Sequence, residues 1–133
     1  MYIILLHKIQ KMKTNKIVYY ISTGIISIMM IYSSIVYHTQ EELVAAFRHL
    51  GFPDYFRIEL AIAKFIGAVL LWIPANRNIR EWAYAGFGFN FISAFIAHLS
   101  VGDSVSLFVF PLVFLFILSV SYISYHNILK SKV

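Results

Sequence analysis

Four apolar stretches, each about as long as a membrane is thick, determine the class to which this chain belongs. They cover residues 17–37, 55–74, 82–101 and 105–125. A helix needs about 20 residues to cross the hydrocarbon core of a bilayer, where it satisfies its own backbone hydrogen bonds. The stretches therefore predict an all-α, membrane-spanning protein. The composition agrees, because only 13% of the 133 residues are charged, whereas a soluble domain has about a quarter.

The connections between the stretches are short, which favours an up-down four-helix bundle that forms one domain over residues 1–133. Gly102, Asp103 and Ser104 make up the whole of the last connection. Gly102 suits a left-handed helix C-cap, and Asp103 or Ser104 suits the N-cap of the next helix. The third and fourth stretches are therefore expected to be neighbours.

The first connection is longer and predicts a short amphipathic helix over residues 40–50. Thr39 and Glu42 form the T-x-x-E pattern of a capping box, and apolar residues downstream share one helix face. Gly51 and Pro53 then end this helix. We expect it to lie at the outer surface of the membrane, partly covering the mouth of the bundle; an ordinary interfacial linker is the alternative.

Basic residues lie mostly on one side of the expected bundle. Eight of the eleven Lys and Arg flank the termini or the connection between the second and third stretches, and two lie on the opposite side. The eight are Lys8, Lys11, Lys13, Lys16, Arg77, Arg80, Lys130 and Lys132, and the two are Arg48 and Arg57. The positive-inside tendency then predicts a multi-pass protein of the cell (cytoplasmic) membrane with both termini in the cytoplasm. Residues 1–11 are an apolar and basic extension with no predicted function, and Met12 would serve equally well as the start of translation.

Several classes of function are excluded or disfavoured. The net charge of +5 does not indicate a nucleic-acid partner, because the basic residues cluster at the edges of apolar stretches rather than on one face. The absence of cysteine excludes disulfides, thiolate metal sites and iron–sulfur clusters. The spacings of His38, His49 and His98 match no metal motif, so no metal site is predicted. No catalytic motif is recognisable, and catalysis by this chain alone is not expected.

Lys64 stands in the middle of the second apolar stretch. A lysine at the centre of a membrane helix costs about 2.5 to 3.5 kcal/mol, so Lys64 is expected to face protein or water rather than lipid. Its neighbours at helical spacing, Ala61, Gly67 and Ala68, are small enough to let another helix come close. Glu59 lies about 140° away around the same helix and is poorly placed to pair with it. The partner of Lys64 is therefore expected from another helix.

A small and polar stripe, repeating every four residues, runs along the third stretch. It consists of Gly86, Asn90, Ser93, Ala94, Ala97 and His98. Such residues are typical of helix–helix contacts in membranes, so the stripe is expected to face the interior. Side chains lean towards the N-terminus of their own helix, so Lys64 and His98 should converge in the outer half of the bundle. The candidate intramembrane polar pocket consists of Lys64, His98, Asn90, Ser93 and Glu59.

These polar residues also have structural explanations. Lys64 is either a functional site or a cation satisfied by hydrogen bonds to Asn90 or His98. Pro111 leaves the carbonyl of Leu107 without its helical donor, which makes that oxygen a further acceptor. A histidine such as His98 is more often a satisfied polar residue than a ligand.

Several motifs in the chain resemble those of the DoxX-like family. They are "HLGFPDY" at 49–55, Lys64 followed by Gly67, Pro74, "EWAYAGF" at 81–87 and "AHLSVGD" at 97–103. The resemblance spans residues 14–125 and implies a small four-helix protein of the bacterial cytoplasmic membrane. Ten residues of these motifs are expected to have structural rather than ligand-binding roles. They are Gly51, Pro53, Gly67, Pro74, Glu81, Trp82, Tyr84, Gly86, Gly102 and Asp103.

Three functions stay open at this point. The first is a non-catalytic subunit or helper of another membrane or membrane-associated redox protein, or an assembly of several copies of this chain. The second is a subunit of a quinone-linked oxidoreductase, because the DoxX-like family takes its name from a subunit of a thiosulfate:quinone oxidoreductase. A quinone would be the cofactor of this second function, and the sequence gives no evidence of any other cofactor. The third is a binder or carrier of a small anion or lipid that uses Lys64 as its charge.

Overall fold

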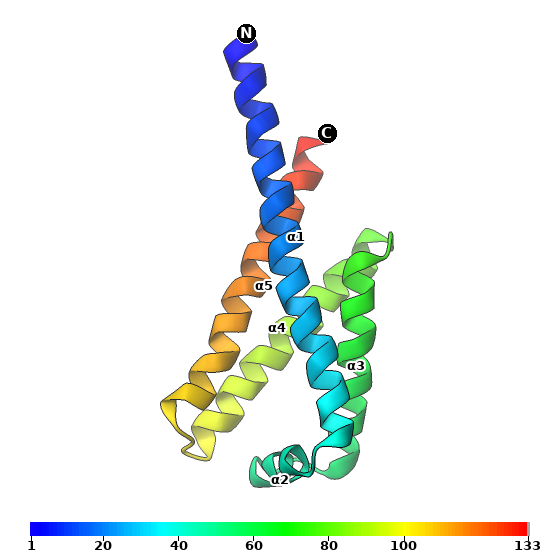
Figure 1. Cartoon of the computed structure of the whole chain (residues 1–133), viewed down its shortest axis with the longest axis vertical. Coiled ribbons are helices and arrows are strands. Elements are labelled where there is room, and N and C mark those ends of the chain that lie inside the picture. The colour runs from blue at the N-terminus through cyan, green and yellow to red at the C-terminus, as the bar shows by residue number, and fades with distance from the viewer. Residues whose placement is uncertain (133) are drawn as a thin grey trace.

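The computed structural model describes residues 1–132, and these residues form five helices and no strand. The helices are α1 (Tyr2–Thr39), α2 (Glu41–His49), α3 (Asp54–Trp72), α4 (Arg77–Ser100) and α5 (Val105–Ser131) (Figure 1). The predicted all-α class is confirmed.

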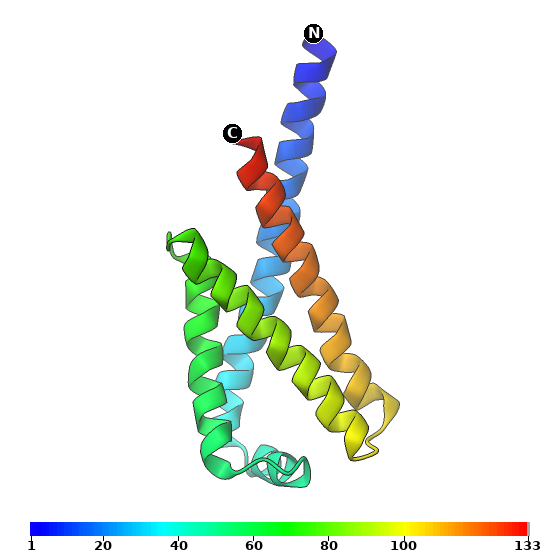
Figure 2. The same ribbon diagram turned by 180° about the vertical axis from the view of Figure 1, so that it is seen from behind.

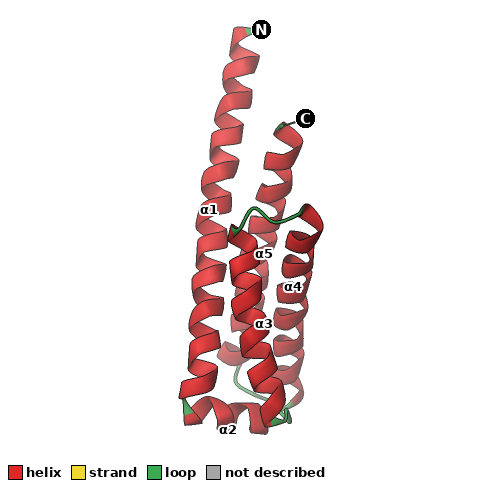
Figure 3. Cartoon of the chain, turned by 90° about the vertical axis from the view of Figure 1, so that its right-hand side faces the viewer, coloured by secondary structure: helices red, strands yellow, loops and turns green. Residues whose placement is uncertain are grey.

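The four long helices pack side by side, while α2 lies across one end of them (Figure 3). Helix α1 packs against α3 and α5, and α4 packs against the same two helices. Both termini lie at one end of the molecule, and α2 and the 101–104 turn lie at the other, while the 73–76 turn lies between the two ends because α1 and α5 extend beyond it (Figure 1). Helices α3 and α4 meet at the 73–76 turn and diverge towards α2 (Figure 2).

The observed helices extend beyond the predicted apolar stretches at most ends. Helix α1 begins at Tyr2, so residues 1–11 continue the first predicted helix instead of forming a separate segment. Helix α4 begins at Arg77 and α5 continues to Ser131, because polar residues continue these helices beyond the apolar cores. Helix α3 ends at Trp72, since the residue before Pro74 is driven into an extended conformation.

The short helix predicted over residues 40–50 is present as α2, but its predicted capping box is wrong. Thr39 is the last residue of α1, and its hydroxyl donates to the carbonyl of Ile35 at 3.2 Å. Gln40 is the N-cap of α2 and makes no capping bond through its side chain. At the other end, Gly51 adopts the left-handed conformation with a φ of +84°, which ends α2 as predicted.

The turn between α4 and α5 contains the predicted left-handed glycine, but neither predicted cap makes a capping bond. Gly102 has a φ of +73°. Ser104 is the N-cap of α5, yet its hydroxyl contacts that of Ser106 at 3.1 Å instead of a backbone amide. Asp103 is not a cap either, because its carboxylate binds two histidines.

The packed core lies between α1, α3, α4 and α5. Ile26, Met30 and Leu71 are fully buried there. Three hydroxyls within this core pair with one another, because an unpaired polar group in an apolar interior is costly. The hydroxyl of Ser121 lies 2.7 Å from that of Thr23 and 2.8 Å from that of Tyr84.

Of the four helices expected to span a membrane, α1 and α5 are long and apolar enough to do so. In the most apolar part of α5, only 17% of the residues are buried within the protein, so most of its apolar surface faces outward. Helices α3 and α4 do not meet the same measure.

Candidate functional site

Lys64 is buried at the middle of α3, with 6% of its surface exposed. Its Nζ donates to the hydroxyl of Ser33 at 3.0 Å and to that of Tyr37 at 2.7 Å. The same ammonium lies 4.1 Å from the centroid of the Tyr37 ring. The prediction that Lys64 faces protein is confirmed, whereas the predicted partners on α4, Asn90 and His98, are wrong.

The reason for this difference is the path of α1. Helix α1 packs against α3, whereas α4 diverges from α3 towards the α2 end (Figure 2). The Lys64 side chain leans towards the N-terminus of α3 and so reaches the last turns of α1. Sequence reasoning missed Ser33 and Tyr37, although their spacing of four residues places them on one face of α1.

Lys64 has no counter-ion within the described chain. The ion pairs formed by residues 1–132 join Arg48 to Asp54, His49 and His98 to Asp103, and Arg77 and His126 to Glu81. Both partners of Lys64 are neutral hydroxyls, and they use two of the three N–H donors of an ammonium. One N–H donor of Lys64 therefore has no hydrogen-bond partner among residues 1–132, and its positive charge has no carboxylate counter-ion there.

A cavity of about 640 Å³ lies beside Lys64, between α3 and α4 and beneath α2. We call it the Lys64 cavity. A second cavity of about 560 Å³ lies on the other side of Lys64, among α1, α4 and α5. Lys64, Asn90 and His98 line both cavities, whose other lining residues are mainly aliphatic and aromatic. The two cavities thus bring the same few polar groups together with a large apolar surface.

The small and polar stripe of α4 lines the Lys64 cavity along its whole length. The face of α4 that packs into the core is a different one and carries Phe87 and Phe91. Of the candidate pocket residues, Lys64, Asn90, Ser93 and His98 line the Lys64 cavity, whereas Glu59 is exposed and lines neither cavity. The prediction that Glu59 belongs to the pocket is therefore wrong, because Glu59 lies about 140° from Lys64 around α3.

Gly67 of α3 lies directly against the ring of Phe87 on α4. A Cβ atom added at Gly67 would lie 2.7 Å from Cζ of Phe87, so only glycine fits at this distance. The predicted close approach of another helix to Gly67 is confirmed. The two helices diverge from the 73–76 turn towards α2 (Figure 2).

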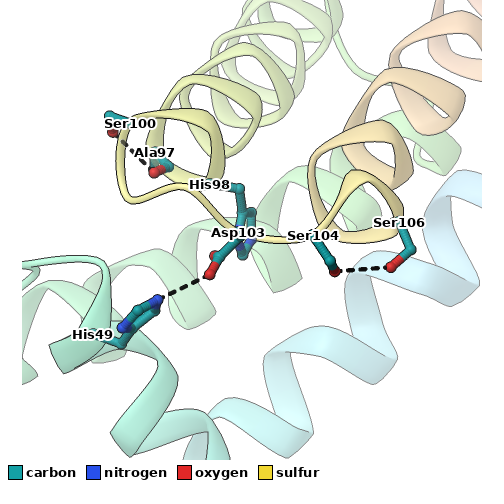
Figure 4. A network of polar contacts seen from close by, with 7 residues as sticks. All are labelled: His49, Ala97, His98, Ser100, Asp103, Ser104 and Ser106. Carbon is teal, nitrogen blue, oxygen red and sulfur yellow. Dashed lines mark hydrogen bonds and ion pairs between the residues drawn. The ribbon is translucent and has the colours of Figure 1, made fainter.

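A polar cluster joins α2 to the turn between α4 and α5 at the mouth of the Lys64 cavity (Figure 4). The Nδ1 atom of His98 lies 2.6 Å from one carboxylate oxygen of Asp103, and Nε2 of His49 lies 2.9 Å from the other. The hydrogen bond from His98, followed by that from His49, lowers the pKa of Asp103. His98 is therefore held by Asp103 and not by Lys64, and the sequence offered no spacing signal for the contribution of His49.

Helix α2 is fixed over the cavity by contacts with α1 and α3 as well. The Phe47 side chain is buried, and its ring lies 4.9 Å from that of Tyr37. Arg48 forms an ion pair with Asp54 at 2.8 Å, and Arg57 donates to the backbone carbonyl of Tyr37. The residue that binds the Lys64 ammonium is thus also a support for α2.

The sequence model of the DoxX-like family matches residues 21–121. The chain belongs to the DoxX-like family. No curated protein and no solved structure matches it. The matched segment contains every residue named here as lining the cavities, and family membership together with two long apolar helices points to a membrane protein.

The DoxX-like motif at 81–87 lies in the half of the molecule away from α2. Glu81 lies 2.7 Å from Nε2 of His126 and 3.8 Å from Nε of Arg77. Tyr84 is buried in the core, whereas Trp82 is 80% exposed. These contacts fix α4 against α5 and give the motif a structural explanation.

Proposed function

We propose that this DoxX-like protein is a membrane protein that binds an anionic amphiphile, an apolar molecule with a carboxylate or phosphate group, in the Lys64 cavity. The observation that carries this proposal is a buried ammonium without a carboxylate partner, beside a cavity of about 640 Å³. Ligand sites typically have volumes of about 300–1,000 Å³ and mainly apolar linings with a few polar groups.

The proposed placement in the membrane is that of an up-down bundle in which α1, α3, α4 and α5 all cross the bilayer. Large apolar side chains on the outside of the long helices support it, such as Phe89 and Phe116, which are 72% and 70% exposed. The excess of lysine and arginine at the end that contains the termini supports a cytoplasmic location for both termini. In this placement α2 lies at the outer surface of the cytoplasmic membrane.

The charge of the ligand follows from the cost of burying Lys64. An unpaired charge in an apolar interior is unfavourable by several kcal/mol. The hydroxyls of Ser33 and Tyr37 solvate the ammonium but do not neutralise it. An anionic oxygen that accepts the third N–H would form a neutral pair, so an anion gains more from this site than an uncharged ligand of the same shape.

The position of the cavity openings indicates that the ligand has an apolar part. Phe89 lines the Lys64 cavity and is largely exposed, as is Phe110 beside the second cavity. Both therefore lie where the cavities reach the apolar outside of the long helices. In a bilayer these openings face acyl chains, which favours a ligand that enters from the membrane.

The cavity also distinguishes this function from the other two that the sequence leaves open. A helper without a ligand would be expected to pack Lys64 tightly against neighbouring helices. A quinone carbonyl could accept the free N–H of Lys64, but it would leave the positive charge without a counter-ion. We therefore place the anionic amphiphile first and use a quinone analogue as the alternative ligand in the test.

The test is a binding titration of the purified protein in detergent with a fluorescent fatty acid, comparing wild type with Lys64→Met. Loss of one charge-assisted hydrogen bond is expected to raise Kd at least about tenfold, which corresponds to about 1.4 kcal/mol. Lys13→Met is the matched control, because Lys13 is exposed and lies far from the cavity along α1. Its Kd is expected to equal that of wild type.

A methyl ester of the fatty acid and a short-chain quinone analogue complete the design. The ester should bind wild type about as weakly as the acid binds Lys64→Met. Equal binding of the fatty acid by wild type and Lys64→Met, both shown to be folded by thermal unfolding, would contradict the proposal. Tighter binding of the quinone analogue than of the acid would replace it with the quinone alternative.

A further inference from the structure

The cluster at the mouth of the Lys64 cavity determines where the proton of His98 lies. An ionised carboxylate accepts hydrogen bonds and donates none. Two imidazole nitrogens contact Asp103, at 2.6 and 2.9 Å, and these bonds favour its ionised form (Figure 4). The Nδ1 atom of His98 must therefore carry hydrogen, as a ring nitrogen does when a carboxylate orients it.

The second ring nitrogen of His98 then becomes available to the cavity. In a neutral imidazole with hydrogen on Nδ1, Nε2 has a free lone pair and accepts hydrogen bonds. Nε2 of His98 has no hydrogen-bond partner among residues 1–132, and the His98 side chain lines both cavities that meet at Lys64. The same space therefore contains a cationic donor on α3 and a neutral acceptor on α4.

We infer that His98 is a second ligand contact, and that the site selects anionic amphiphiles that also carry a hydroxyl group. This inference rests on the proposed function, since the anionic group of the same ligand pairs with Lys64. The ligand hydroxyl donates to Nε2 of His98, while Asp103 holds the ring in the accepting tautomer. Asp103 is thus a positioning residue, and His49 supports it from α2.

Two sources offer this chemistry, a phospholipid headgroup with free hydroxyls and a hydroxy fatty acid. Each is represented by a matched pair of ligands that differ in hydroxyl content and keep the same anionic group. Phosphatidylglycerol is compared with phosphatidylethanol, and 2-hydroxypalmitate is compared with palmitate. Binding is measured by displacement of the fluorescent fatty acid from wild type and from His98→Leu, Asp103→Asn and Lys64→Met.

Wild type is expected to prefer the hydroxylated member of at least one pair by about three- to tenfold, the range of one hydrogen bond. His98→Leu should reduce this preference to less than about twofold, whatever its effect on the affinity for the other member. Asp103→Asn keeps Nε2 of His98 but no longer holds the ring in the accepting tautomer, so the preference should weaken. It supplies the same comparison if His98→Leu does not fold. The pair that shows the preference identifies the source of the ligand.

The failures of the two hypotheses can be told apart. If binding depends on Lys64 but neither pair shows a preference that depends on His98, this inference is wrong and the proposed function stands. If the fatty acid and all four ligands bind Lys64→Met as tightly as wild type, the proposed function is wrong and the inference falls with it.

Discussion

Gly67 of α3 faces the ring of Phe87 on α4, and this contact gives a sharp test of how the two helices pack. A Cβ atom at position 67 would lie 2.7 Å from Cζ and 2.9 Å from Cε1 of that ring. Ordinary van der Waals contact begins at 3.4 Å, so the ring or the helix would have to move by about 0.7 Å. Phe87 is only 4% exposed and belongs to the packed core, which leaves the ring little room to move.

Two opposing effects determine the stability of Gly67→Ala. Overpacking a core costs about 1–3 kcal/mol, whereas replacing glycine by alanine inside a helix gains up to about 1 kcal/mol. The expected net result is a loss of about 1 kcal/mol in the free energy of unfolding. Gly88→Ala on α4 is the matched control, because its added Cβ would meet no atom within 4 Å. That variant should be unchanged or slightly more stable.

The assay is reversible unfolding in mixed micelles of a mild detergent and dodecyl sulfate, followed by circular dichroism. Gly67→Ala is measured alone and together with Phe87→Leu, which shortens the opposing side chain. In the Phe87→Leu background Gly67→Ala should no longer destabilise the protein. Equal stabilisation by Gly67→Ala and Gly88→Ala, or a loss that does not depend on Phe87, would refute the packing of α3 on α4 described above.

Three further predictions follow from other contacts. Tyr37→Phe removes the closer hydroxyl partner of the buried ammonium and should lower the free energy of unfolding by about 1–3 kcal/mol, measured in the same assay. Ser121→Ala leaves the hydroxyl of Tyr84 without its partner and should cost a similar amount, whereas Ser119→Ala, on the exposed face of α5, should change stability by less than about 0.5 kcal/mol. Asp103 has a lowered pKa in the folded protein, so its contribution is present above the ordinary value of about 4 and is lost as the pH falls through the lowered pKa. The protection of α2 amides against hydrogen exchange, corrected for the pH dependence of the intrinsic exchange rate, should therefore fall at acidic pH in wild type. Protection that changes with pH no more in wild type than in Asp103→Asn would count against this contact.

The elements of this fold could be predicted because the signals that define them are local. Span length and hydropathy set the positions of the long helices, and glycine at 51 and 102 marks turns that need a positive φ. The close approach of another helix to Gly67 could also be predicted, because the residues around Lys64 on α3 are small. The ends of the helices were less accessible, because polar residues such as Thr39 continued a helix that hydropathy alone would have ended.

The partners of Lys64 could not be predicted from local signals. Both α1 and α4 offer polar side chains at a suitable depth, and the choice between them depends on which helix stays close to α3. That choice is set by the divergence of α3 and α4 towards α2, which depends on the whole packing (Figure 2). The cavity has the same origin, because it fills the space that this divergence opens. The contact between Asp103 and His49 escaped prediction because the two residues lie 54 positions apart in the chain.

Native mass spectrometry of the protein released from a mild detergent tests the central claim most directly. The claim is that the Lys64 ammonium, which lacks a counter-ion in the protein, receives one from a membrane amphiphile. Wild type is expected to retain an added mass that fragments to an anionic amphiphile, and Lys64→Met is expected to lose it while Lys13→Met keeps it. Recovery of the same mass on Lys64→Met, or of wild type without any bound anion, would contradict the account.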